Sequence, residues 1–329
     1  YMNETDLLIE AERRLENSVK QQMLSDVPLG AFLSGGIDSS SIVALMQKNS
    51  IDPVKTFTIG FKDNNFDEAI YANDVAKHLG TDHQELYVTS NDAMSVIPYL
   101  SSIYCEPFSD SSQIPTYLVS KLASESVTVS LSGDGGDEIF GGYNRYIDGK
   151  NTWVNFNRLP KQIRYSFGKL FTAFSPSLWD KCFNTVKYIL PKDLRFTSVG
   201  DKAHKLAEVL FQDTQREFYT TLCSHWKNPD NVVLGSKEYS SLISKESEWL
   251  DSYDFTEQMM AMDTRTYMPD DILVKVDRAA MACSLETRIP MLSKNVVEFA
   301  WSLPIEQKIK EGQGKWPLRQ VLYKYVPEH

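Results

Sequence analysis

A short apolar run that ends in a glycine-rich loop and leads into a helical pattern most constrains what this chain can fold into. The run is 31–33, the loop continues as Ser34-Gly35-Gly36, and the helical pattern extends from Ser39 to Gln47. Backbone N–H groups converge in such a loop, and the helix N-terminus adds partial positive charge. Glycines let the backbone close on a phosphate without a Cβ in the way. The stretch therefore predicts a phosphate site at the carboxyl end of a strand.

Asp38 narrows the type of phosphate site. A carboxylate repels a bare phosphate, so its presence in this loop predicts a bridging Mg²⁺. The loop lacks the Gly-Lys-Ser/Thr ending of kinases and GTPases. It resembles instead the pyrophosphate-binding loop of ATP pyrophosphatases, which split ATP between the α and β phosphates. The alternative is an ordinary strand–helix turn capped by serine.

Composition limits the partners and the compartment. The chain has 329 residues and a formal net charge of −10, which argues against a nucleic-acid partner. Its four cysteines are widely spaced, without a Cys-x-x-Cys pair, so a zinc site or redox dithiol is disfavoured. No apolar run could span a bilayer and no signal peptide is present, so we expect a cytoplasmic protein with no membrane partner.

Strand and helix patterns alternate along the first part of the chain, which predicts an α/β fold with a doubly wound parallel sheet. The expected strands are 31–33, 54–59, 84–88 and 127–131. The expected helices are 5–25, 38–48 and 66–79, the last closed by Gly80, with two more within 91–124. We expect an α/β domain over 1–150, a mainly helical region over 151–260, and helices over 261–329 that return to the site and are truncated.

A second glycine-rich loop follows the strand expected at 127–131. It reads Ser132-Gly133-Asp134-Gly135-Gly136-Asp137 and continues to Tyr143. Ligands of open parallel sheets bind at the carboxyl ends of strands, so the two loops can face one another across a nucleotide. Asp38 and Asp137 could then share one Mg²⁺. The alternative is a capped turn with solvated acids.

A helix is also expected from about Pro269, a residue suited to a first helical turn. Asp271 and Lys275 lie four apart on its face, where they could hold the amine and carboxylate of an amino acid. A plain ion pair within the helix is the alternative.

Together the two loops resemble the synthetase domain of the glutamine-dependent asparagine synthetase family, and the segments 274–281 and 284–290 extend the resemblance over nearly the whole chain. The resemblance implies a fold of the adenine nucleotide α-hydrolase type. It implies ATP-binding roles for Leu33, Ser34, Gly35, Gly36, Asp38, Ser39, Ile59, Ser132 and Gly133. It also implies catalytic roles for Asp134, in forming an acyl-adenylate, and for Lys315, on a segment flanked by glycines. A solvated surface lysine is the alternative for Lys315.

The function implied is an amide-forming ligase that uses ATP and Mg²⁺. A carboxylate, aspartate in our first interpretation, is adenylated and then attacked by ammonia from a glutaminase domain absent here. The stretch 106–116 contains no basic residue, which leaves the acceptor acid open. One rival is an amidotransferase for another acid, such as a uronic acid of a surface polysaccharide. Another is a non-catalytic nucleotide-binding module. A tRNA-thiolating relative is disfavoured by the acidity, and a homodimer stays open.

Overall fold

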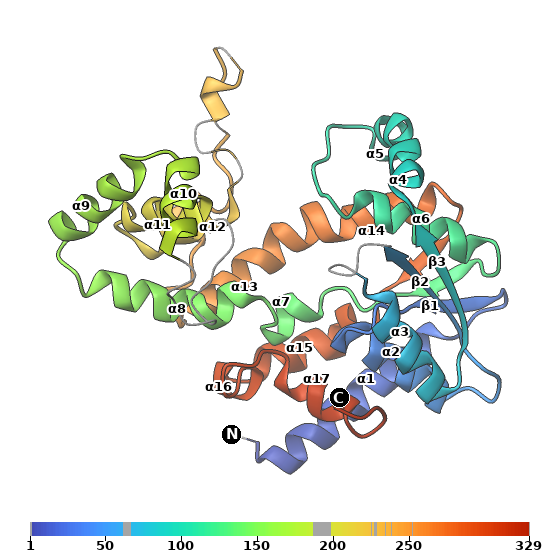
Figure 1. Ribbon diagram of the computed structural model, residues 1–329. Coiled ribbons are helices and arrows are strands. Elements are labelled where there is room, and N and C mark those ends of the chain that lie inside the picture. The colour runs from blue at the N-terminus through green and yellow to red at the C-terminus, as the bar shows by residue number, and fades with distance from the viewer. Residues whose placement is uncertain are drawn as a thin grey trace. The chain divides into compact units, whose positions relative to one another are not determined.

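The computed structural model describes the chain except for residues 1, 62–66, 187–198, 225, 227, 228, 234, 238, 252 and 329. It divides into two compact units (Figure 1). The first unit comprises residues 1–143 and 263–329, and the second comprises 144–262. The assignment of functional domains to 1–150, 151–260 and 261–329 stays a prediction.

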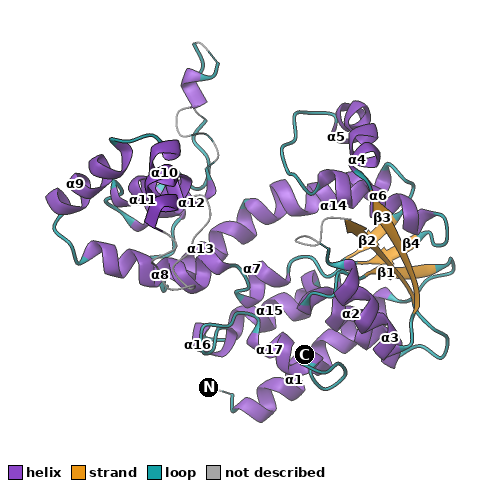
Figure 2. Cartoon of the chain, viewed as in Figure 1, coloured by secondary structure: helices purple, strands orange, loops and turns teal. Residues whose placement is uncertain are grey.

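Five parallel strands form the sheet of the first unit in the order β3-β2-β1-β4-β5 (Figure 2). The strands are β1 (Leu29–Phe32), β2 (Lys55–Phe61), β3 (Asp82–Val88), β4 (Val129–Leu131) and β5 (Glu286–Arg288). Because the order runs outward in both directions from β1, the doubly wound α/β class predicted from the sequence is confirmed. β1 and β4 are neighbours at the point where the order reverses, and there a crevice opens beyond their carboxyl ends.

Helices cover both faces of this sheet. One layer holds α1, α2, α15 and α17, whose apolar side chains share a single core with the strands, and the opposite layer holds α6 and α14. The helices of the first unit are α1 (Glu4–Gln22), α2 (Ile37–Lys48), α3 (Ala69–Leu79), α4 (Ser90–Val96), α5 (Leu100–Tyr104), α6 (Gln113–Ser124), α7 (Gly136–Phe140), α14 (Val274–Met281), α15 (Lys294–Ser302), α16 (Ile305–Lys308) and α17 (Trp316–Leu322).

The first helix shows why these residues form these elements. Asn3 caps α1 by accepting a hydrogen bond from the Asp6 N–H, and a stripe at helical spacing buries Ala11, Leu15 and Val19 against the core. The predicted closure of α3 by Gly80 is confirmed, since this glycine has φ +73°. Phe66, the expected start of that helix, lies outside the described residues.

Two expectations about secondary structure were wrong. The segment 91–124 contains the three helices α4, α5 and α6 rather than two, because the chain turns through a short 3₁₀ segment at Ile97–Tyr99 and a left-handed Cys105. The strand β5 was not expected, because its three residues carry charges at both ends and show no apolar alternation.

The second unit consists of helices, short 3₁₀ segments and loops in its described part, where no strand occurs. Its helices are α8 (Asn144–Asn157), α9 (Lys161–Thr172), α10 (Pro176–Val186), α11 (Val199–Leu210), α12 (Gln215–Cys223) and the beginning of α13 (Phe255–Arg265). Trp153 and Phe255 pack edge-on against Phe218 in its core. Among the described helices of the whole chain, none is both long and apolar enough to cross a membrane.

Candidate active site

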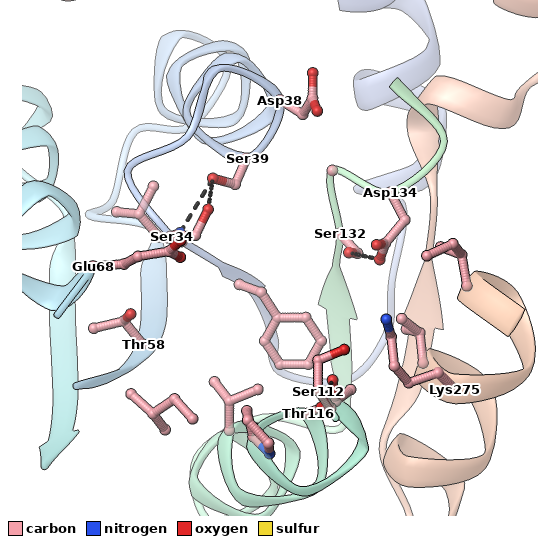
Figure 3. A pocket seen from close by; sticks show the side chains of 18 of the residues that line it. Ser34, Asp38, Ser39, Thr58, Glu68, Ser112, Thr116, Ser132, Asp134 and Lys275 are labelled. Carbon is pink, nitrogen blue, oxygen red and sulfur yellow. Dashed lines mark hydrogen bonds between the residues drawn. The ribbon is translucent and has the colours of Figure 1, made fainter. Parts of the chain in front are cut away.

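The first glycine-rich loop leaves β1 at its carboxyl end. The Leu33 N–H donates to the Phe57 carbonyl oxygen over 2.9 Å, so the sheet pairing continues to the first residue of the loop. Ser39, in the first turn of α2, turns back onto the loop: its Oγ accepts from the Ser34 N–H over 3.1 Å and lies 2.9 Å from Ser34 Oγ (Figure 3). Gly35 adopts φ +77°, and a side chain there would collide with Tyr71. The loop is thus a rigid turn with two hydroxyl groups beside the helix N-terminus.

The second loop, at the end of β4, lies directly against the first. A Cβ at Gly133 would stand 2.6 Å from the Ser39 backbone nitrogen, so only glycine allows this approach. Ser132 Oγ donates a short hydrogen bond to the Asp134 carboxylate (Figure 3). The structure therefore brings together the two loops that the sequence places about 100 residues apart.

A cavity of about 560 Å³ opens between these loops, β2, α6 and α14. Ten of the residues singled out from the sequence line it: Leu33, Ser34, Asp38, Ser39, Ile59, Ser132, Gly133, Asp134, Asp137 and Lys275. Apolar side chains of Phe32, Phe57 and Val119 form another part of its wall. An apolar pocket beside a rigid phosphate-type loop is the arrangement a nucleotide base and its phosphates require. Gly35, Gly36, Asp271 and Lys315 are not among the lining residues.

Lys315 nevertheless lies where the two glycine-rich loops meet, the part of the site that is expected to hold phosphates and is called its phosphate end below. Its Nζ lies 2.5 Å from Asp38 Oδ2 and 2.7 Å from Asp137 Oδ1, and its side chain is only 13% exposed. The solvated surface lysine considered for this position is therefore wrong. Lys315 is the N-cap residue directly before α17, with φ +58°, and its N–H donates to the Phe140 carbonyl oxygen over 3.1 Å. Lys315, close to the last residue of the sequence, thus contacts an acid in each of the two glycine-rich loops.

The acids of the site have perturbed proton affinities. Burial, together with the neighbouring Asp137 and Asp134, raises the pKa of Asp38 to about 6, against the opposing attraction of Lys315. Burial also raises the pKa of Asp134. The pKa of Lys315 is raised by Asp38 and Asp137, although burial opposes this. The phosphate end is therefore rich in carboxylates that need cations to remain ionised together.

The residues fit a single Mg²⁺ shared with a phosphate group. Asp38 and Asp137 converge on one ammonium nitrogen, so their oxygens can reach a common cation. Asp38 Oδ1 is buried and has no hydrogen-bond partner among the described residues. The described part of the chain has no cluster of three or more His, Cys, Asp or Glu that could hold a metal alone. Proteins usually bind Mg²⁺ through one or two carboxylates, and substrate phosphates and water complete its coordination shell.

Lys275 is paired differently from the ion-pair alternative, and the expected role of Asp271 and Lys275 in holding an amino acid stays a prediction. Lys275 Nζ lies 2.8 Å from Asp110 Oδ2, on the segment before α6, rather than beside Asp271. The physical reason is a π-helical turn at Met268–Leu273 directly before α14, which breaks the four-residue spacing of an α-helix. Asp110 carried no local signal in the sequence, because it is 165 residues from its partner.

A second pair missed from the sequence is Glu138 and Tyr143. The Tyr143 hydroxyl donates to Glu138 Oε1 over 2.7 Å, and both residues line the cavity. Glu138 is almost completely buried, and this burial raises its pKa to about 6. The glycine- and acid-rich loop in the sequence contains both residues, but only the fold shows that they contact each other.

Comparisons with known proteins agree with these features. A family model described as asparagine synthase matches residues 10–329. The chain is 32% identical over 326 residues to asparagine synthetase 1 (glutamine-hydrolyzing) of Bacillus subtilis, covering 99% of this chain and 48% of that protein. It is 36% identical over 152 residues to asparagine synthetase B (glutamine-hydrolyzing) of Escherichia coli, covering 41% of this chain and 27% of that protein. The chain spans about half the length, or less, of these curated relatives.

Proposed function

The chain belongs to the asparagine synthase family, and from this premise we propose that it is the ATP-dependent synthetase part of an amidotransferase. The observation that carries the proposal is the cluster of Lys315, Asp38 and Asp137 at the meeting point of the two glycine-rich loops. A fixed cation beside two acids at a helix N-terminus suits the cleavage of a nucleotide between its α and β phosphates. The adjoining apolar wall suits the base.

The first step is adenylation of a carboxylic acid. A carboxylate oxygen of the acceptor attacks the α-phosphorus of ATP, and the bond from that phosphorus to the bridging oxygen breaks, so pyrophosphate leaves with the electron pair. Negative charge grows on the phosphate oxygens as this happens. Lys315 and the Gly35 N–H of the first loop stabilise that charge. The hydroxyls of Ser34 and Ser39 share one hydrogen bond, so one of their two protons can be donated to a phosphate.

A Mg²⁺ ion held by Asp38 and Asp137 would neutralise the departing pyrophosphate. Asp134, hydrogen-bonded to Ser132, holds the acceptor side of the cavity in place while the adenylate forms. Leu33 and Ile59, which line the cavity beside Phe57, contact the adenine and ribose.

The second step forms the amide. Ammonia attacks the acyl carbon of the adenylate, its nitrogen loses a proton, and AMP leaves with the electron pair of the acyl C–O bond. The relatives named above are glutamine-hydrolyzing enzymes, so we propose that the ammonia comes from a glutaminase part outside residues 1–329. Aspartate is the acceptor we propose, with asparagine as the product.

An ATP–pyrophosphate exchange assay tests this function. With the full-length protein, Mg²⁺ and aspartate, labelled pyrophosphate should enter ATP, and Lys315→Ala should abolish most of the exchange. Exchange that depends on a uronic acid and not on aspartate would overturn the choice of acceptor. Absence of MgATP binding in a calorimetric titration would overturn the synthetase function itself and favour a non-catalytic module.

A further inference from the structure

Another cavity, small and polar, lies between α1 and the start of α15. Its volume is about 160 Å³, less than a third of that of the cavity proposed to hold the nucleotide (below, the nucleotide cavity), and no described residue lines both. The described lining consists of two arginines, two serines, two asparagines and a glutamine, five of them on α1, and it contains no carboxylate. The proposed adenylating function gives this cavity no role.

The first turn of α15 leaves hydrogen-bonding groups unpaired beside this cavity. Ser293 is the N-cap of α15, but its hydroxyl makes no capping bond, and its Oγ is buried without a hydrogen-bond partner among the described residues. A serine at this position ordinarily accepts from an N–H of the first helical turn. In the described part of the chain, the N–H groups of Lys294 and Asn295 also make no hydrogen bond. With the partial positive charge of the helix N-terminus, these groups favour an anion.

Two guanidinium groups on α1 add full positive charges. Arg13 and Arg14 both bind Glu10, over 2.7 and 2.5 Å. Their hydrogen bonds lower the pKa of Glu10 to about 2, so one negative charge stands against two positive ones. A guanidinium has five N–H donors, and Arg13 uses its Nε and Nη2 on Glu10. The donors of its other nitrogen can therefore serve a ligand in the cavity.

The two walls of the cavity are fastened to each other. Arg14 Nη1 donates to the Asn295 carbonyl oxygen over 2.8 Å. Ser18 Oγ, also in the lining, donates to the Pro290 carbonyl oxygen over 2.8 Å and is buried. Because α1 and the start of α15 already hold one another, a ligand would not have to assemble the site, which lowers the cost of binding.

We propose that this cavity binds a phosphate group, either as inorganic phosphate or as a phosphate monoester of a larger molecule. A tetrahedral oxyanion carries acceptors on all sides, which suits guanidinium donors from α1 together with hydroxyl and N–H donors from α15. Leu292, directly before Ser293, lies so close to the second glycine-rich loop that a Cβ at Gly135 would stand 2.5 Å from it. Bound phosphate would thus hold the segment that packs against that loop. The site does not depend on the proposed adenylating function.

Thermal melting of the full-length protein tests the site, with KCl at equal ionic strength as the reference. Inorganic phosphate at ten times its Kd should raise the Tm of the first unit by about 3–6 °C. Asn17→Asp and Ser293→Asp each place a carboxylate in the cavity lining, and each should raise the Kd for phosphate by about 10-fold or more. Aspartate caps a helix as well as serine does, so Ser293→Asp should not weaken the fold.

A matched control separates a built site from general attraction of anions. Lys294→Met makes the same change in charge beside the cavity, but this side chain is 84% exposed and outside the described lining, so the Kd should change by only about 2-fold or less. A second control is Lys315→Met, because phosphate could instead bind at the phosphate end of the nucleotide cavity. The phosphate response should persist in both controls.

The pattern across these variants decides the question. A response that persists in Lys294→Met and Lys315→Met and is lost in Asn17→Asp and Ser293→Asp supports the site. An equal response in all variants, no response in the parent, or loss in Lys315→Met alone would overturn it. Asn17 is exposed, so its variant keeps the test valid if Ser293→Asp does not fold. Glycerol 3-phosphate identifies the source: a response to it as well supports a monoester, and a response to inorganic phosphate alone supports the free anion.

Discussion

Replacement of Lys315 by methionine removes the ammonium group and keeps an unbranched apolar side chain. The change leaves Asp38 and Asp137 facing one another without their counter-ion, and their side chains are 14% and 31% exposed. Removing one partner of a fully buried ion pair costs about 3–5 kcal/mol. Solvent at Asp137 lowers this cost, and so does proton uptake by Asp38, whose pKa is already about 6. We therefore expect a loss of about 2 kcal/mol in the free energy of unfolding.

A divalent ion should reverse that loss in the variant. For a unit of about this size, 2 kcal/mol corresponds to a fall in Tm of about 4–8 °C. A ligand at one hundred times its Kd stabilises the folded state by about 2.7 kcal/mol, enough to restore the Tm. In the parent protein the same ion must compete with the Lys315 ammonium for Asp38 and Asp137, so its effect should be much smaller.

Thermal melting without nucleotide measures this competition directly. Mg²⁺ or Mn²⁺ is titrated against parent and Lys315→Met, with KCl at equal ionic strength as the control. The response should disappear in a double variant that also carries Asp38→Asn. An equal Mg²⁺-dependent shift of the Tm in parent and variant, or none in the variant, would refute the idea that Lys315 stands where the metal binds.

Three further predictions follow from single contacts. Asp38→Asn should weaken MgATP binding by about 10- to 100-fold in calorimetry, and unchanged affinity would contradict a metal role. Gly35→Ala, at φ +77° and against Tyr71, should destabilise by about 2–4 kcal/mol, because the collision adds to the cost of the left-handed backbone. Gly80→Ala, at φ +73° with open space, should cost about 1 kcal/mol; equal losses would refute the packing argument. Burial raises the pKa of Glu12, but hydrogen bonds, led by the one from Lys324, outweigh burial and lower the pKa to about 2. Ionised Glu12 therefore stabilises the fold at neutral pH, and this contribution is lost as the pH falls from about 4.5 toward 2. Glu12→Gln should flatten this acid limb in equilibrium unfolding.

The sheet and its phosphate end were predictable because their signals are local. The apolar runs before Ser34 and before Ser132 are each followed by glycines within a few residues. A short stretch of sequence is therefore enough to predict both the strand and the turn that follows it. Parallel strands place their carboxyl ends at one edge, so the meeting of the two loops follows from topology. The strand Glu286–Arg288 could not be predicted in this way. It has no apolar pattern of its own, and it is a strand because it pairs with the free edge of β4.

The wall of the cavity around Lys275 was not predictable, because its contacts join distant segments. Lys275 was considered as an ion-pair partner of Asp271, besides a role in holding an amino acid, on the assumption of a regular α-helix, and the π-turn before α14 removes that regularity. Its actual partner, Asp110, lies in a segment that showed no basic residue and therefore no sign of an ion pair. The residue pattern of one helix cannot show that its lysine pairs with a carboxylate from a distant segment.

The segment that carries Lys315 shows how the site combines a fixed backbone with an exchangeable side chain. Gly314 lies so close to Gly141 that a Cβ would collide with its carbonyl oxygen, and the Lys315 N–H donates to Phe140 in the same loop. The backbone of this lysine is therefore fastened to the second glycine-rich loop whatever its ammonium group contacts. Its ion pairs with Asp38 and Asp137, however, are made by a flexible four-carbon stem. If, as proposed, a metal took those carboxylates, the ammonium group would be able to turn to the α-phosphate without any movement of the loop, which is the geometry that stabilisation of a developing charge requires.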